Sequence, residues 1–201
     1  MTNNKITVRT MCVVAIMGAL GFVLMLLDFA TPVAPSFLKF DFSDLPAIIT
    51  SFALGPVAGC AVEFIKNALH LTITKTQGIG ELANFLIGVG FVLPAGIVYK
   101  YKKDRAGALI GAICGALVSA AVSFPVNLFI TYPFYYNFMS KENIVSAYSA
   151  IFPFIDSIEE GLIVVNAPFT FIKGAIDSAI TFLVYKKLSP ILKGKKDKKK
   201  K

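Results

Sequence analysis

Residues 8–31 read VRTMCVVAIMGALGFVLMLLDFAT, and no charged residue falls between Arg9 and Asp28. An α-helix rises 1.5 Å per residue, so about 20 apolar residues are needed to cross the hydrocarbon core of a bilayer. This stretch therefore predicts a membrane-spanning helix from Val8 to Thr31, ending before Pro32. It is longer than the apolar region of a secretory signal, so we interpret it as a first span.

The rest of the chain repeats this pattern. The 201 residues are 56% hydrophobic and 16% charged, with a mean hydropathy of +0.70, whereas a soluble domain is about 25% charged. We expect an all-α integral membrane protein, a bundle of six transmembrane helices. Residues 1–192 would form the single membrane domain and 193–201 a basic tail. The further helices are expected at 43–54, which is too short to cross squarely, and at 57–74, 80–99, 106–130 and 161–188.

The distribution of Lys and Arg predicts the orientation. Basic residues flank the first helix, fill the connection at 100–105 and dominate the tail, and six spans place these three regions on one side. Cytoplasmic loops are enriched in Lys and Arg, so we expect a plasma-membrane protein with both termini in the cytoplasm. The aromatic connections 32–42 and 131–158 would then lie outside. The net charge of +8 raises the question of nucleic acid, but nine of the twenty basic residues fall in 186–201. Such a terminal cluster beside an apolar helix indicates a topology signal and contact with anionic lipid.

One predicted helix carries charged residues that are costly to place in a bilayer. Glu63, Lys66, Asn67 and His70 share one helical face. We favour an internal Glu63–Lys66 pair facing the bundle over direct contact with a ligand. A lone histidine without a second ligand at suitable spacing gives little support for a metal site.

The last helix has a longer polar stripe, which must face protein or a cavity rather than lipid. Lys173 could pair with Asp177 at i, i+4, or it could reach a ligand carbonyl, and both readings stay open. Asn166 lies nearer the outer end and is the better ligand candidate. The stripe comprises Asn166, Thr170, Lys173, Asp177 and Thr181.

Further polar side chains fall at the same depth. Glu81 and Asn84 share a face at the outer start of the fourth helix, and Asn127 lies near the outer end of the fifth. A single Asn could join two helices by a hydrogen bond. Several of them beneath aromatic loops indicate a pocket for a planar aromatic ligand with hydrogen-bonding edges.

Motifs of catalysis are absent from the sequence. It has no GxxxxGK[ST] phosphate loop, no HExxH and no GxSxG, and Cys12, Cys60 and Cys114 lack metal-ligand spacing. We expect no enzymatic activity of its own and no cofactor. If such a membrane protein drives transport of its ligand, it needs a partner that supplies the ATPase.

Five segments together resemble the S components, the substrate-binding subunits, of energy-coupling factor (ECF) vitamin transporters. Two of them, 37–47 and 80–85, are similar to the riboflavin branch, and the segment at 166–174 is common to S components. The five segments are FLKFDFSDLPA (37–47), FALGPVAG (52–59), EFIKNALH (63–70), GELANF (80–85) and NAPFTFIKG (166–174).

The resemblance implies a six-helix protein that holds riboflavin near the outer surface and reorients in the membrane to deliver it. It implies a membrane-embedded coupling subunit and two ATPase subunits as partners, with Ala15, Gly18 and Ala19 of the first helix facing the coupling subunit. Residues 132–158 contain no motif that aligns with the family. The candidate ligand-binding residues are Phe37, Leu38, Lys39, Phe40, Asp41, Asp44, Glu81, Asn84, Asn127, Asn166, Thr170 and Lys173.

Three alternatives remain at this point. The chain could be an S component for another vitamin or for a flavin phosphate. It could be a facilitator that works without ATPase subunits. The last alternative, a small membrane enzyme, has no catalytic constellation in its favour.

Overall fold

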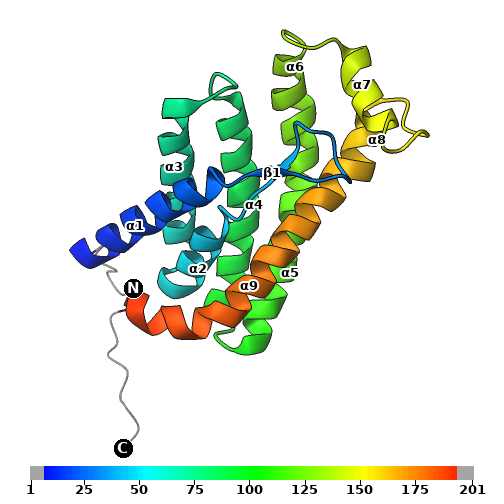
Figure 1. The fold of residues 1–201 in the computed structure, drawn as a ribbon. Coiled ribbons are helices and arrows are strands. Elements are labelled where there is room, and N and C mark those ends of the chain that lie inside the picture. Colours follow the sequence, from blue (N-terminus) through cyan, green and yellow to red (C-terminus); the bar gives the residue numbers. More distant parts are fainter. Residues whose placement is uncertain (1–6, 194–201) are drawn as a thin grey trace, which may run out of the picture.

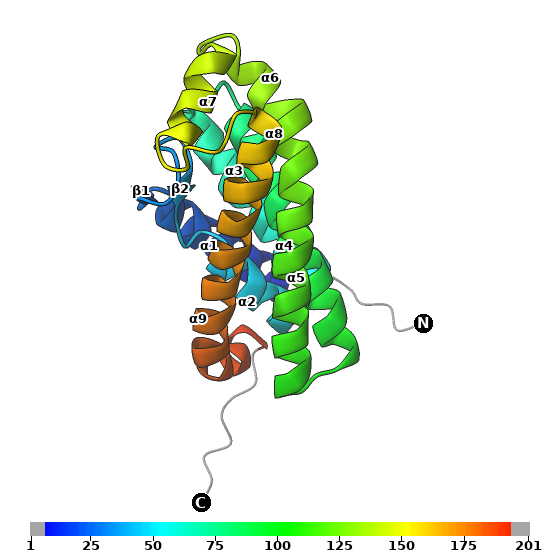
Figure 2. The same ribbon diagram turned by 90° about the vertical axis from the view of Figure 1, so that its right-hand side faces the viewer.

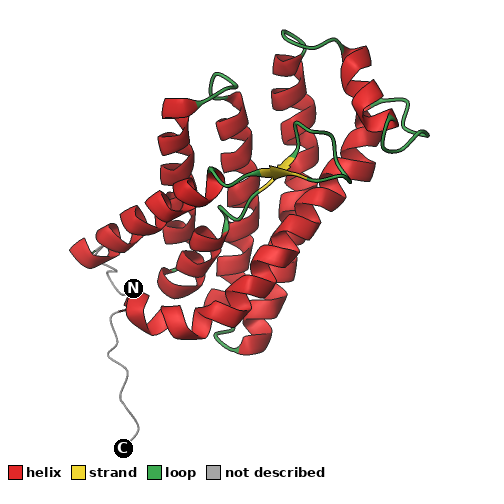
Figure 3. Cartoon of the chain, viewed as in Figure 1, coloured by secondary structure: helices red, strands yellow, loops and turns green. Residues whose placement is uncertain are grey.

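The computed structural model describes residues 7–193, with side chains described as far as residue 185, so most of the predicted tail lies outside the described residues. Helices form nearly all of this part of the chain (Figure 3). The principal helices are α1 (Val8–Met25), α2 (Leu45–Leu54), α3 (Pro56–His70), α4 (Ile79–Tyr101), α5 (Arg105–Val126) and α9 (Ala167–Lys193). Shorter elements lie between them: β1 (Phe29–Ala30), β2 (Lys39–Phe40), η1 (Leu71–Ile73), η2 (Asn127–Thr131), α6 (Tyr132–Tyr135), α7 (Lys141–Ser149), α8 (Ile158–Gly161) and η3 (Leu162–Asn166).

Six principal helices agree with the predicted bundle, but their lengths differ. By length and composition, four continuous helical stretches of the described chain could cross a membrane: Val8–Met25, Ile79–Tyr101, Arg105–Tyr135 and Ile158–Tyr185. The two shorter helices, α2 and α3, are joined by a sharp corner at Gly55. Its φ of +109° lies in the region that glycine adopts without steric cost.

Two predicted boundaries are wrong. The first helix ends at Met25 rather than Thr31, because Phe29 and Ala30 instead pair antiparallel with Phe40 and Lys39. The fifth helix does not stop at Ile130 but continues through the π-helical segment η2 into α6. The connection 131–158 contains the short helices α6 and α7.

The helices give the molecule two distinct ends (Figures 1 and 2). One end holds the α3–α4 connection together with α6 and α7, and the opposite end holds the α4–α5 connection and the last turns of α9. The strands β1 and β2 lie across the bundle between these ends.

The buried apolar side chains form two clusters. One centres on α2, α4 and α5 and includes Ile48, Phe91 and Val92. The other joins the 31–44 segment to α6, α7 and η3, with Tyr132 and Tyr148 among its largest members. The cavity of the candidate ligand-binding site takes lining residues from both clusters.

Candidate ligand-binding site

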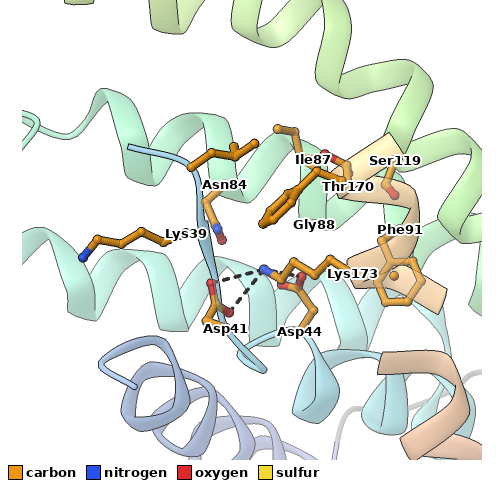
Figure 4. A pocket seen from close by; sticks show the side chains of 13 residues that line it. Lys39, Asp41, Asp44, Asn84, Ile87, Gly88, Phe91, Ser119, Thr170 and Lys173 are labelled. Atoms are coloured by element: carbon orange, nitrogen blue, oxygen red, sulfur yellow. Dashed lines mark hydrogen bonds and ion pairs between the residues drawn. The ribbon is translucent and has the colours of Figure 1, made fainter. Parts of the chain in front are cut away.

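A cavity of about 110 Å³ lies where the segment between β1 and α2 meets α4, α5 and α9 (Figure 4). Its wall combines apolar side chains with a few charged and amide groups, as is usual for small-molecule sites. The lining residues are Leu38, Lys39, Asp41, Asp44, Asn84, Ile87, Gly88, Phe91, Ser119, Phe169, Thr170, Lys173 and Gly174.

Lys173 is the central charged group of this wall. Its ammonium nitrogen lies 3.2 Å from Oδ1 of Asp41 and 3.0 Å from Oδ2 of Asp44, and Figure 4 shows it reaching from α9 toward both carboxylates. The i, i+4 partner considered from the sequence, Asp177, forms no ion pair with it. Both carboxylate oxygens of Asp177 are buried without a hydrogen-bond partner among the described residues.

Asp44 also joins a second, fully buried lysine. Lys66 on α3 pairs with Asp44 and, at 2.9 Å, with Oε2 of Glu63, and it donates a hydrogen bond of 2.9 Å to Oγ of Ser43. The predicted Glu63–Lys66 pair is therefore confirmed, with Asp44 as an additional partner. Pairing and hydrogen bonding of this kind offset the cost of burying the charges.

Local backbone chemistry positions the two aspartates. Oδ1 of Asp41 accepts a hydrogen bond of 2.8 Å from the backbone N–H of Ser43, the turn that aspartate commonly forms with the chain two residues on. Asp44 is the residue before α2, and Pro46 occupies its first turn. The turn and the start of α2 thus hold both carboxylates toward Lys173.

A glycine lets α3 and α4 approach beneath the cavity. A Cβ atom at Gly88 would lie 2.7 Å from the carboxyl carbon of Glu63, closer than real Cβ contacts allow. The absence of a side chain at this position is what permits the carboxylate to sit against α4.

The structure brings seven of the predicted ligand residues to the cavity. Asn84 presents a buried Oδ1 with no hydrogen-bond partner within the described chain. Lys39 is about half exposed and pairs with Asp28 at 2.8 Å, so its charge is already matched at the surface. The seven are Leu38, Lys39, Asp41, Asp44, Asn84, Thr170 and Lys173.

Phe37 and Asn166 lie in a layer next to the cavity rather than in its wall. Oδ1 of Asn166 accepts a hydrogen bond of 2.7 Å from the Tyr148 hydroxyl, which also contacts the hydroxyl of Tyr132. Phe37 packs edge-on against Tyr148, with ring centroids 5.8 Å apart. Burial raises the pKa of Tyr148, so its hydroxyl stays a hydrogen-bond donor. These contacts fasten the 31–44 segment to α7 and η3.

The other three predicted residues do not line the cavity, although the partner of Phe40 does. Nδ2 of Asn127 donates to the carbonyl oxygen of Ser123 at 2.7 Å. Glu81 contacts Nδ1 of His70 at 2.7 Å, and Phe40 packs against Phe169 with ring centroids 6.0 Å apart. Asn127 and Asn166 both belong to π-helical segments, a distortion that is frequent at functional sites.

Sequence reasoning missed six lining residues. The three on α4 follow Asn84 at helical spacing and therefore lie on the same face of that helix, so Asn84 could have indicated them. Ser119 gave no signal beyond being a hydroxyl in an apolar helix. The six are Ile87, Gly88, Phe91, Ser119, Phe169 and Gly174.

Only part of the α1 surface that was expected to contact the coupling subunit is exposed. Ala15 and Ala19 are exposed, but Gly18 is buried, and a Cβ there would lie 2.7 Å from Cβ of Ile65. Gly18 therefore packs against α3 and does not belong to the exposed surface. The remaining small residues lie among exposed apolar side chains of α1, including Ile16 and Leu20.

The fold and this cavity define a multi-pass membrane protein with an internal polar site, the arrangement of a substrate-binding transport subunit. Residues 9–185 match the family described as ECF transporter, substrate-specific component, and the chain belongs to that family. It is a non-enzymatic transport protein, and as an S component it works with an energising module.

Relatives extend this assignment over nearly the whole chain. The chain is 32% identical to "Riboflavin transporter RibU" of Staphylococcus aureus, with 92% of this chain and 93% of that protein covered. It is 31% identical to "Riboflavin transporter FmnP" of Bacillus subtilis, covering 91% and 93%. A solved structure titled "Structure and mechanism of the S component of a bacterial ECF transporter" superposes with a TM-score of 0.72 at 31% identity, covering 92% of this chain and 97% of that one.

Proposed function

We propose that this chain binds riboflavin and is the substrate-binding subunit of an ATP-driven importer, with both termini in the cytoplasm. The main support is the composition of the cavity wall, which combines hydrogen-bonding groups with apolar side chains. Lys173 and Asn84 offer hydrogen-bonding groups suited to the carbonyl and imide edge of an isoalloxazine ring. Leu38, Ile87 and Phe91 offer apolar contact to the ring itself.

The charges of the cavity favour an uncharged flavin over a flavin phosphate. Lys173 is already shared between Asp41 and Asp44, and Lys39 pairs with Asp28. A phosphate dianion would therefore meet two carboxylates and no unmatched ammonium group in this wall. Unpaired charge in a poorly solvated site is costly, so riboflavin should bind more tightly than its phosphate.

Binding requires the cavity to widen. Its volume of about 110 Å³ is below the roughly 300–1,000 Å³ typical of sites for drug-sized ligands. Three walls are helices, and the fourth is the 31–44 segment, which contains only the short strand β2. We infer that residues 31–40 of this segment move away from α9 to admit the ligand, while Asp41 and Asp44 stay paired with Lys173.

The test is quenching of riboflavin fluorescence by the purified protein in detergent. Saturable quenching at one equivalent is expected, with weaker quenching for flavin mononucleotide and none for thiamine. Asn84→Ala should weaken affinity about tenfold, because it removes one ligand hydrogen bond and breaks no hydrogen bond to another described residue. Asn137→Ala, at an exposed site that does not line the cavity, is the control, and it removes only a hydrogen bond to the carbonyl oxygen of Phe134.

Absence of quenching would overturn the riboflavin assignment while leaving the family intact. Tighter binding of the mononucleotide would reassign the ligand to a flavin phosphate. If Asn84→Ala and Asn137→Ala change the affinity for riboflavin equally, this cavity is not the binding site.

A further inference from the structure

An apolar groove of about 460 Å³ lies between α5 and α9 and shares no lining residue with the candidate flavin cavity. Its floor is made of small buried residues of α5, among them Ala112 and Ala116, whereas Leu109 and Leu183 at its rim are exposed. From α9, Ala175 and Ala179 contribute small exposed side chains. The groove is thus open toward the surroundings of the bundle, which in a membrane are lipid.

The groove continues toward the end of the bundle that carries the α4–α5 connection. A second cavity, of about 430 Å³, shares four of its lining residues with the groove: Phe52, Ala108, Phe182 and Leu183. This second cavity ends at Lys103, Asp104 and Arg105.

The charges at that mouth are predominantly positive. The Asp104 carboxylate caps α5 by accepting a hydrogen bond of 2.6 Å from the backbone N–H of Gly107. Lys103 and Arg105 are exposed, and neither takes part in an ion pair with another described residue. An apolar channel that opens between two basic side chains matches an amphiphile with a negative head group.

We propose that this continuous groove binds one anionic phospholipid, with an acyl chain between α5 and α9 and the phosphate held by Lys103 and Arg105. The charge bias of the sequence assigns this end to the cytoplasmic leaflet, where anionic lipids attract basic side chains next to the membrane. The head-group charge distinguishes this occupant from a partner helix, which would need the apolar walls but not the two cations. The site is independent of riboflavin binding.

The experiment is native mass spectrometry of the full chain after incubation with equal amounts of phosphatidylglycerol and phosphatidylcholine of matched acyl chains. One retained phosphatidylglycerol is expected. Each basic side chain near the head group contributes roughly a fivefold preference, so the wild type should favour phosphatidylglycerol roughly 25-fold. The double variant Lys103→Gln/Arg105→Gln should bring the preference close to one, and Ala179→Phe should abolish retention of both lipids.

Matched controls separate this site from general lipid attraction. Lys75→Gln removes an exposed cation at the opposite end of the bundle, and Ala121→Phe adds the same bulk at an exposed α5 position outside the groove. Neither should change retention. The thermal unfolding midpoint of every variant, measured alongside, verifies that it is folded whether or not riboflavin proves to be the ligand.

Three results would overturn the proposal. Equal retention of the two lipids by the wild type would show that the protein does not recognise the charge of the head group. If Lys103→Gln/Arg105→Gln still prefers phosphatidylglycerol as the wild type does, other cations, such as the terminal lysines, hold the head group. Cross-linking of Ala179→Cys to the coupling subunit in the assembled transporter, with lipid lost on assembly, would assign the groove to a partner helix.

Discussion

The ammonium group of Lys173 on α9 lies 3.0 Å from the carboxylate of Asp44 at the start of α2. Asp44 in turn contacts Lys66 on α3, so one carboxylate connects the last helix with the α2–α3 pair. Buried charges depend on each such partner, because an uncompensated charge away from water is strongly unfavourable. The candidate cavity is therefore also a point at which the fold can be destabilised.

Replacing Lys173 by Met should lower stability by roughly 3–5 kcal/mol, the cost of removing one partner from a buried ion pair. Asp41 and Asp44 would lose their shared cation, while the apolar stem would be retained. Thermal unfolding in detergent measures the change. Lys39→Met, which breaks the exposed pair with Asp28, should cost about 1 kcal/mol or less. Similar losses in both variants would contradict the difference in burial.

Asp177→Asn should leave stability unchanged or raise it by about 1 kcal/mol, because its buried carboxylate oxygens have no hydrogen-bond partner in the described part of the chain. Asp44→Asn is the matched comparison and should lower stability by roughly 3–5 kcal/mol, since two lysines depend on that charge. Chemical denaturation of the two variants side by side measures both. A large loss in Asp177→Asn would show that this carboxylate has a partner in solution.

Gly88→Ala should destabilise the protein by about 1–3 kcal/mol, because the new methyl group would overlap the Glu63 carboxylate. Gly90→Ala on the same helix is the control. Its Cβ would meet Val122 at an ordinary 3.4 Å, and alanine gains about 1 kcal/mol of helix propensity over glycine. Unfolding midpoints that fall equally in both variants would argue against close approach at Gly88.

Tyr148→Phe should cost about 1–3 kcal/mol, because Oδ1 of Asn166 would lose its donor in a buried position. Tyr101→Phe, at an 85% exposed site, should have little effect.

Burial raises the pKa of Tyr148 above its ordinary value of 10.0, so the unfolded state releases this proton first. The contribution should be complete below about pH 10 and decline above it. Unfolding midpoints of wild type and Tyr148→Phe that fall in parallel from pH 9 to 11 would contradict this.

Ala15→Trp should prevent co-purification with the energising module while leaving ligand binding unchanged, because Ala15 lies on the exposed face of α1 and distant from the cavity wall. A large ring at a small-residue contact holds the two helices apart. Ala121→Trp, exposed on α5, serves as the control. Retained association in Ala15→Trp, together with loss in Ala121→Trp, would move the interface to α5.

The spans and their polar faces could be predicted from the sequence because each depends on properties local to one helix. Hydrophobic length indicated six helices, and helical spacing placed Glu63 next to Lys66 and Asn84 on a shared face. The boundaries at Met25 and Tyr135 could not be predicted in this way. The first depends on pairing with a strand ten residues farther along, and the second on a π-helical continuation stabilised by packing against α7 and η3.

The sequence by itself determined that the chain enters a membrane and that Lys173 must face the interior, since a charge in hydrocarbon is costly wherever its neighbours lie. Only the tertiary structure decided which carboxylates meet it. Asp41 and Asp44 are far from Lys173 along the chain, yet they pair with it in place of Asp177 on its own helix. The physical reason is that ion pairing depends on the register in which the 31–44 segment, α2 and α9 pack, and no spacing within a single helix encodes that register.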